Sequence, residues 1–148
     1  MNKIDFTDAY FMQQALTEAR VAYEKDEVPV GVVIVSAGKI IAKSHNLTET
    51  LNDVTAHAEM LAITSATETI GGKYLNNCTM YVTLEPCIMC AGAITLAQIE
   101  KLVIGAPDEK RGYSKFKPSP LHPKTEVVTG VLEDECGELI KGFFRGKR

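Results

Sequence analysis

The 148-residue sequence has no apolar stretch that approaches the length of a membrane-spanning helix, no internal repeat and no low-complexity tract. A helix that crosses a bilayer needs about 20 consecutive, mostly apolar residues, and the N-terminal segment, residues 1–8, is polar and acidic. We therefore expect neither a signal peptide nor a membrane anchor, no membrane partner, and a cytoplasmic location.

An excess of basic residues is also missing. The formal net charge is −3 at pH 7, so the composition as a whole gives no indication of nucleic-acid binding. The charge is uneven, however, because residues 1–100 hold 6 basic and 12 acidic residues, whereas residues 101–148 hold 10 basic and 7 acidic residues. The proportions of hydrophobic residues (45%) and charged residues (24%) are ordinary. We expect one globular domain over residues 1–148.

Cysteines are few, with four in the chain. In an intracellular protein of this size, a metal site or buried thiols explain four cysteines more readily than disulfides do. Cys87 and Cys90 form a C-x-x-C spacing between an apolar strand run and a small-residue helical stretch, and the free N–H groups of a helix start favour thiolates there. Cys78 and Cys136 lie in or beside elements that should pack, and we expect both to be buried apolar thiols.

Apolar periodicity and turn residues predict alternating helices and strands. The predicted helices are 7–25, 55–70, 88–97 and 132–148, and the predicted strands are 30–35, 40–41, 78–84, 102–105 and 127–131. The first two strands should form a hairpin, and the strand, helix, strand order over 78–105 should form a parallel crossover, so the sheet should be mixed. Residues 106–126, rich in proline, should form a long, partly ordered loop. In the last helix we expect Leu139, Phe143 and Phe144 to face inward.

His57 can complete a metal site with the two cysteines. One imidazole and two thiolates suit zinc, and three protein ligands leave a fourth tetrahedral position open for water, as in catalytic sites. We therefore predict one zinc ion per chain. Glu59 lies two residues after His57, and because side chains tilt toward the helix N-terminus, both can reach a site beyond the helix end. A carboxylate that is not a ligand but lies beside the water is placed to transfer its protons.

These residues resemble a known signature. His57-Ala58-Glu59 followed by Pro86-Cys87-Ile88-Met89-Cys90 matches the H-x-E and P-C-x-x-C pattern of zinc-dependent nucleobase deaminases. Over nearly the whole chain, the sequence resembles bacterial tRNA-specific adenosine deaminases of the cytidine and deoxycytidylate deaminase superfamily. The segments that carry this wider resemblance are 28–31, the region of Asn46, 55–59, 81–87, 89–93, 135–136 and 143–145.

The resemblance implies a fold, an activity and an assembly. The fold would be α/β, a cytidine-deaminase-like three-layer α/β/α sandwich with a five-stranded mixed sheet, and the protein would be a homodimer. The activity would be hydrolytic deamination of adenosine to inosine at the wobble position of tRNA, with Glu59 as catalytic residue. The implied substrate contacts are Asn46, which would bond to the base edge, and Val30, Ala58 and Pro86.

Other polar residues carry weaker indications. The basic residues Lys110, Arg111, Arg145 and Lys147 are candidate RNA contacts, although charges at a helix end are usually only solvated. We expect His45 to be a hairpin-end residue rather than a substrate contact, and Glu85 to have a structural role.

Two other functions remain open at this point. A deaminase of free guanine, cytosine or a nucleoside such as cytidine would use the same metal site, and the acidic charge together with a short, proline-rich segment 111–126 favours it. The block 83–92 favours tRNA instead. A zinc-stabilised binding module without turnover would need a fourth ligand such as Cys78 or Cys136, and it would have no use for Glu59.

Overall fold

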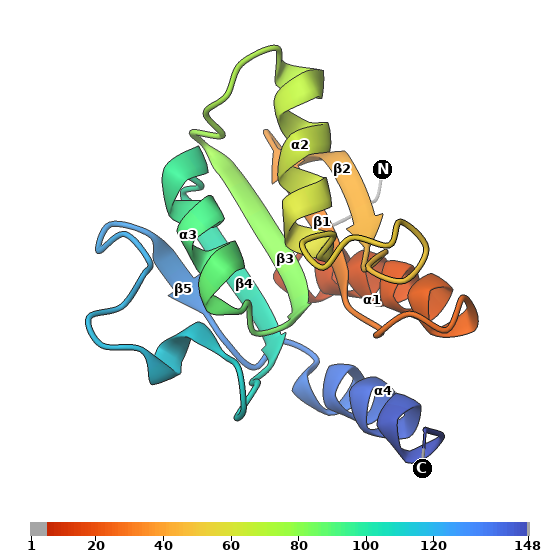
Figure 1. Cartoon of the computed structure of the whole chain (residues 1–148). Helices are drawn as coiled ribbons and strands as arrows, with labels where there is room; N and C mark the ends of the chain where they lie inside the picture. Colours follow the sequence, from red (N-terminus) through yellow and green to blue (C-terminus); the bar gives the residue numbers. More distant parts are fainter. Residues whose placement is uncertain (1–5, 148) are drawn as a thin grey trace.

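A five-stranded mixed sheet forms the middle layer of the structure, a computed structural model that describes residues 6–147 (Figure 1). The strands are β1 (Gly31–Ser36), β2 (Lys39–His45), β3 (Cys78–Leu84), β4 (Lys101–Ala106) and β5 (Glu126–Val128), in the spatial order β2-β1-β3-β4-β5. β1 pairs antiparallel with β2 and β3, whereas β4 pairs parallel with β3 and β5. The predicted hairpin and the predicted parallel crossover are both confirmed.

Helices cover both faces of the sheet. They are α1 (Asp8–Glu24), α2 (Ala58–Ile70), α3 (Ile88–Ala97) and α4 (Glu133–Arg145). Successive strand residues point to opposite faces, so Val32 and Ile34 of β1 join a core with α2 and α3, while Val33 and Val35 join a second core with α1 and α4. The three-layer α/β/α architecture is therefore confirmed. None of the helices within residues 6–147 has both the length and the apolarity that a membrane span requires.

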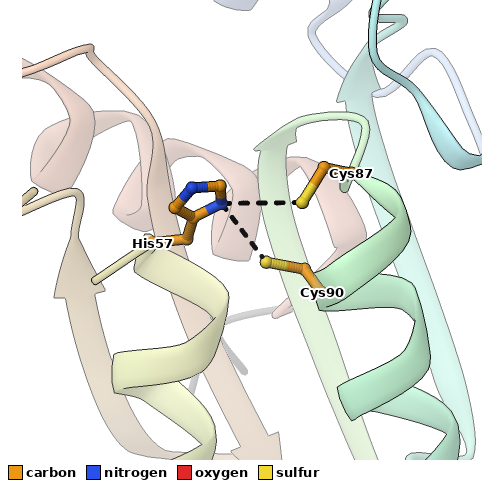
Figure 2. Close-up of side chains that lie close together, drawn as sticks. All are labelled: His57, Cys87 and Cys90. Atoms are coloured by element: carbon orange, nitrogen blue, oxygen red, sulfur yellow. Dashed lines mark hydrogen bonds between the residues drawn. The ribbon is translucent and has the colours of Figure 1, made fainter. Parts of the chain in front are cut away.

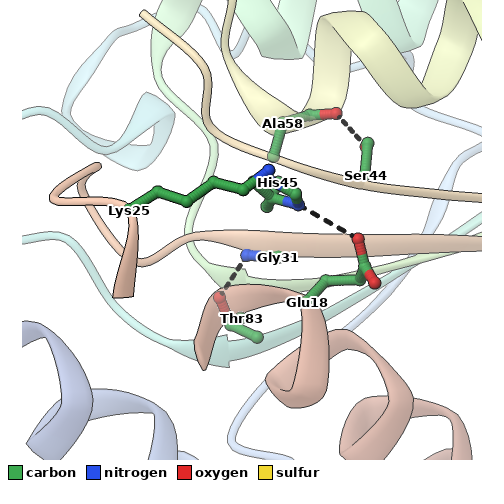
Figure 3. A network of polar contacts seen from close by, with 7 residues as sticks. All are labelled: Glu18, Lys25, Gly31, Ser44, His45, Ala58 and Thr83. Carbon is green, nitrogen blue, oxygen red and sulfur yellow. Dashed lines mark hydrogen bonds and ion pairs between the residues drawn. The ribbon is translucent and has the colours of Figure 1, made fainter. Parts of the chain in front are cut away.

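Close packing of α1 on β1 depends on Gly31. A Cβ atom at this position would collide with the backbone carbonyl of Ala15 and would lie 2.5 Å from the backbone nitrogen of Ala19. The backbone N–H of Gly31 also donates a hydrogen bond of 3.1 Å to the hydroxyl of Thr83 on β3 (Figure 3). Only glycine fits here, because there is no space for a Cβ atom. Its absence lets α1 pack closely against the end of the sheet where β1 begins.

Several predicted boundaries were wrong by a few residues. α2 begins at Ala58 rather than at Thr55, because Asp53 accepts hydrogen bonds of 2.8 Å from both the backbone N–H and the hydroxyl of Thr55 and holds a turn there. β5 ends at Val128 rather than at residue 131, because Gly130 has a φ of 82° and turns the chain toward α4. The predicted loop 106–126 contains a short 3-10 helix, Tyr113–Lys115.

The inward face of α4 differs from the prediction at one residue. Cys136 and Phe143 are buried and Leu139 is partly buried against the second core, but Phe144 is 53% exposed. Residues 136, 139 and 143 share one helix face, whereas residue 144 lies about 100° further round the helix. The expectation that Phe144 faces inward was therefore wrong. Cys78 and Cys136 are both buried, as predicted.

Candidate functional site

His57, Cys87 and Cys90 converge where two helices begin. His57 precedes α2 and Cys87 precedes α3, and neither side chain caps its helix. The Nδ1 atom of His57 lies 3.6 Å from Sγ of Cys87 and 3.5 Å from Sγ of Cys90 (Figure 2). Between residues 6 and 147, this is the one group of three or more His, Cys, Asp or Glu side chains whose donor atoms gather as metal ligands do.

The distances from the imidazole nitrogen to the two sulfurs fit a zinc ion. Zinc binds sulfur at about 2.3 Å and imidazole nitrogen at about 2.0 to 2.1 Å, so a tetrahedral angle at the metal places the nitrogen about 3.6 Å from each sulfur. The distances of 3.5 and 3.6 Å in the structure match this value. The donor types agree as well, because imidazole and thiolate together favour zinc over the hard cations magnesium and calcium.

The two thiols differ in acidity. The hydrogen bond that Cys90 donates to Cys87 and the hydrogen bond with His57 together lower the pKa of Cys87 to about 4, although burial acts to raise it. The hydrogen bond between the two thiols, together with burial, raises the pKa of Cys90. The hydrogen bond to Cys87 also raises the pKa of His57. A bound cation would replace the shared proton and stabilise both thiolates.

Glu59 lies beside these donors in the first turn of α2 and is only 4% exposed. Burial raises the pKa of the Glu59 carboxyl to about 7. A carboxyl group with a pKa near neutrality can both accept and release a proton, which is what general acid and base catalysis requires.

A second buried carboxyl, Glu85, fastens the loop after β4 to the cysteine segment. Its carboxylate accepts hydrogen bonds from the backbone N–H of Asp108 at 3.2 Å and from the backbone N–H and hydroxyl of Ser114 at 3.0 and 2.8 Å. Beside it, the backbone N–H of Tyr113 donates to the carbonyl of Pro86 at 3.0 Å. The structural role predicted for Glu85 is confirmed, and the loop is held directly against the residue that precedes Cys87.

The predicted basic residues fall into two groups. Lys110 and Arg111 lie on the loop held by Glu85, and the Asp108 carboxylate accepts hydrogen bonds from their backbone N–H groups at 3.1 and 3.0 Å. Neither side chain forms an ion pair with any residue of the described part of the chain. Both charges are therefore free of internal ion pairs within the described residues and are available to a ligand.

The second basic group lies at the C-terminal end of α4. Arg145 forms an ion pair with Glu138, with 3.3 Å between Nη2 and Oε2. Lys147 forms an ion pair with Asp26. Acidic neighbours therefore partly balance the charges of Arg145 and Lys147. These two residues do not form one cluster with Lys110 and Arg111.

The predicted substrate contacts lie around the same end of the sheet. Asn46 follows β2, and its backbone N–H donates to the carbonyl of Val30 at 3.2 Å. Ala58 is fully buried directly after His57, and its carbonyl accepts a hydrogen bond of 2.6 Å from Ser44 (Figure 3). Pro86 directly precedes Cys87. These four residues therefore lie next to the donor group or next to each other, and their contact with a substrate stays a prediction.

His45 is engaged within the protein. Its Nδ1 atom lies 3.1 Å from the carboxylate of Glu18, and its Nε2 atom lies 3.2 Å from the ammonium group of Lys25 (Figure 3). A lysine ammonium group can only donate, so Nε2 accepts from Lys25 and Nδ1–H donates to Glu18. This arrangement ties β2 to α1, as expected of a hairpin-end residue.

Sequence reasoning missed Glu27. This residue is fully buried, and its carboxylate accepts hydrogen bonds from the segment that follows Asn46. In the sequence it is one of three nearby acidic residues, with Glu24 and Asp26, before an apolar strand run. Nothing in that pattern distinguishes it from its neighbours, because the groups that surround it come from more than 15 positions further along the chain.

Comparison with known proteins gives a consistent result. Residues 6–106 match the family described as the cytidine and deoxycytidylate deaminase zinc-binding region. The sequence is 48% identical over 146 residues to the tRNA-specific adenosine deaminase of Bacillus subtilis, covering 95% of this chain and 91% of that protein.

Two solved structures are also similar. One comes from work on A-to-I editing by tRNA:A34 deaminases at the wobble position of transfer RNA, with a TM-score of 0.82, 46% identity, and coverage of 88% of this chain and 98% of that chain. The other is the X-ray structure of guanine deaminase from Bacillus subtilis, with a TM-score of 0.63, 39% identity, and coverage of 66% of this chain and 62% of that chain.

Proposed function

Because the chain belongs to the cytidine and deoxycytidylate deaminase family, and within it to the tRNA-specific adenosine deaminases, we propose that it converts adenosine to inosine at the wobble position of tRNA. The observation that carries this function is the extent of the likeness. Identity of 46 to 48% with the tRNA deaminases extends over almost the whole chain, whereas the 39% identity with the guanine deaminase of Bacillus subtilis covers two thirds of it.

The reaction replaces the exocyclic amino group of adenine by oxygen. The oxygen of a water molecule bonds to C6, the bond from C6 to the amino nitrogen breaks, and ammonia leaves. Bound zinc would supply Lewis-acid chemistry that makes this water acidic near neutral pH. Glu59 takes a proton from the water, delivers it to the neighbouring ring nitrogen, and then moves a proton to the departing amino group. Adenosine and water thus give inosine and ammonia without a net change in protons.

His57, Cys87 and Cys90 are the proposed zinc ligands, with one ion per chain. The match between the measured donor separations and the geometry of zinc supports this assignment. The stoichiometry is supported by the lack of a second such group in the described range, residues 6–147. Glu59 is not a proposed ligand, because its role is to transfer protons.

The substrate contacts proposed are Asn46, Val30, Ala58 and Pro86. An enzyme that reacts at C6 must take the base out of its stack and hold it by its edge. The hydrogen bond between the backbones of Asn46 and Val30, and the positions of Ala58 and Pro86 beside two proposed ligands, support their place around such a base.

Guanine is the competing substrate, because 39% identity links this chain to a guanine deaminase. A binding module without turnover is less well supported, since a buried carboxyl beside the proposed ligands has no use in a structural zinc site. Ammonia release from tRNA, measured side by side with release from free guanine, cytosine and cytidine, separates these functions. We also propose a cytoplasmic location, because bacterial tRNA is found there.

Charge reversal should separate the two basic groups. The double substitution Lys110→Glu and Arg111→Glu should weaken tRNA binding and reduce the slope of log affinity against log salt by about 2, because each lost phosphate contact removes nearly one unit. Arg145→Glu with Lys147→Glu should have the smaller effect, because these charges already have acidic partners. Fluorescence anisotropy over a salt series measures both. If the loop variant kept the salt slope of the wild type, Lys110 and Arg111 would be ordinary surface charges.

We propose that the protein is a homodimer with α3 at or near the interface. α3 carries two exposed large apolar side chains, Ile88 at 46% and Leu96 at 78%. A Cβ atom at Gly92 would meet nothing within 4 Å, so this face of the helix is open in the single chain. Such a surface is typical of a contact between copies.

Light scattering at micromolar protein should therefore give twice the mass of one chain. Leu96→Glu should shift the population toward monomer, because it would place a charge in an apolar contact. Val21→Glu is the matched control, since Val21 is also an exposed apolar residue, at 37%, but lies on α1 on the opposite side of the sheet. A wild type that is only monomeric would contradict the dimer.

A further inference from the structure

Glu27 is a buried carboxylate without a cationic partner. It lies between α1 and β1, is 0% exposed, and forms no ion pair with the residues that the structure describes. Burial alone would raise the pKa of Glu27, but hydrogen bonds from Thr50 and Glu49 outweigh it and lower the pKa below its ordinary value. A buried charge of this kind is costly unless hydrogen-bond donors satisfy its oxygens. The groups that donate to Glu27 therefore stabilise its charged form.

All of these donors come from one segment, which we call the Asn46 loop and define as residues 46–56. The Oε2 atom of Glu27 accepts from the backbone N–H and the hydroxyl of Thr50, both at 2.6 Å, and Oε1 accepts from the backbone N–H of Glu49 at 3.1 Å. A further bond of 3.0 Å, from the N–H of Leu47 to the carbonyl of Ala56, closes the loop. Asn46 at its start is thereby brought close to Ala56, the residue before His57.

Glu27 also determines which end of the Asn46 amide is free. The Nδ2 atom of Asn46 lies 3.4 Å from Oε1 of Glu27 and 3.3 Å from the hydroxyl of Thr48. An ionised carboxylate has no hydrogen to donate, so the amino end of the amide must face it. Both amino hydrogens are then used within the protein. The Oδ1 atom has no hydrogen bond to any residue of the range 6–147. Every fully buried side-chain oxygen or nitrogen in that range has a hydrogen-bond partner, so Oδ1 is not fully buried.

We propose that Glu27 is a positioning residue for the deamination, which holds the Asn46 side chain so that its carbonyl oxygen accepts a hydrogen bond from a donor group of the bound nucleotide. The proposal rests on the proposed function, in which Asn46 contacts the substrate. It makes Asn46 an acceptor, because the neighbouring carboxylate occupies the amino end. Glu27 itself does not touch the substrate and acts through Asn46 and its loop.

The test is a double-mutant cycle between Glu27→Gln and Asn46→Ala. Glutamine keeps the shape of the side chain but can present an N–H to Asn46, which removes the reason for the amide to keep its orientation. Glu27→Gln should lower kcat/KM roughly tenfold, the effect of losing about one hydrogen bond, and should leave the zinc content unchanged. With Asn46→Ala already present, Glu27→Gln should change kcat/KM by less than about twofold, because its effect passes through the missing side chain.

Glu85→Gln is the matched control. Glu85 is also a buried carboxylate that accepts hydrogen bonds from the backbone N–H groups of a loop, but it forms no hydrogen bond with Asn46. Its effect should be the same with and without the Asn46 side chain. If Glu27→Gln behaved like this control, with equal losses in both backgrounds, Glu27 would be a purely structural residue and the proposal would be overturned.

Thr48→Val keeps the test decisive if Glu27→Gln does not fold. It removes the second acceptor of the Asn46 amide, so it should lower kcat/KM with Asn46 present and have no effect without it. An equal effect in both backgrounds, or none in either, would overturn the proposal. The cycle is measured on whichever substrate the wild type deaminates. Failure of the wild type on tRNA would therefore refute the proposed substrate, whereas additive losses on an accepted substrate would refute the role of Glu27.

Discussion

Glu59→Ala should abolish deamination while the protein keeps its zinc. The substitution removes the Glu59 carboxyl, which lies beside the three donor residues, buried in the first turn of α2, with a pKa raised by burial to about 7. General acid and base catalysis of this kind typically contributes about a hundredfold or more to the rate. Inosine formation and metal content, measured on the same preparation, give the two quantities to compare.

Glu59→Gln is the sharper companion variant. It keeps the size and the polarity of the side chain but cannot carry a proton at neutral pH, so it should be as inactive as Glu59→Ala if proton transfer is the role of Glu59. Deamination within a few-fold of wild type in either variant would refute that role. A loss of zinc in both variants would instead make Glu59 a ligand, and the proposed donor set would need to be revised.

His57→Ala and Cys87→Ala should each lose most of the zinc, and with it all measurable deamination. Either change leaves two donors at the site, and two ligands do not hold zinc in the tetrahedral geometry that the distances of the intact site fit. Elemental analysis of the wild type should give about one zinc per chain. Full retention of the metal by either variant would rule out this ligand set.

Cys78→Ala supplies the control for the metal experiment. Cys78 is a buried thiol at the start of β3, where burial raises its pKa, and it is not part of the convergent donor group. Its substitution should leave both zinc and activity in place. If zinc were lost, Cys78 would be a fourth protein ligand, and the site would be the structural kind that has no open position for water.

The donor group was predictable because most of its geometry is local. Cys87 directly precedes α3 and Cys90 lies in its first turn, so their spacing alone brings both sulfurs to one end of one helix. His57 and Glu59 are placed in the same way at the start of α2. The starts of α2 and α3 lie together because of the order of strands in the sheet. That order followed from the family resemblance rather than from the residue pattern.

The features that escaped prediction depend on contacts between distant parts of the chain. Glu27 meets Thr50, 23 positions away, and Lys147 meets Asp26, 121 positions away. No periodicity or motif in the sequence indicates such contacts. The hydrogen bonds from the Asn46 loop to Glu27 were therefore missed, and the four basic residues were treated together as candidate RNA contacts. The wrong expectation for Phe144 has a simpler cause, because two adjacent phenylalanines cannot both face the same side of a helix.

The most direct test of the account is to incubate the wild-type protein with a tRNA that carries adenosine at the wobble position, and with free guanine, cytosine and cytidine at equal concentration. Sequencing of reverse transcripts locates inosine, and ammonia release measures turnover on every substrate. We predict inosine at the wobble position alone, ammonia in an equal amount, and none from the free compounds. Ammonia from guanine or cytosine with the wobble adenosine unchanged would contradict the central claim.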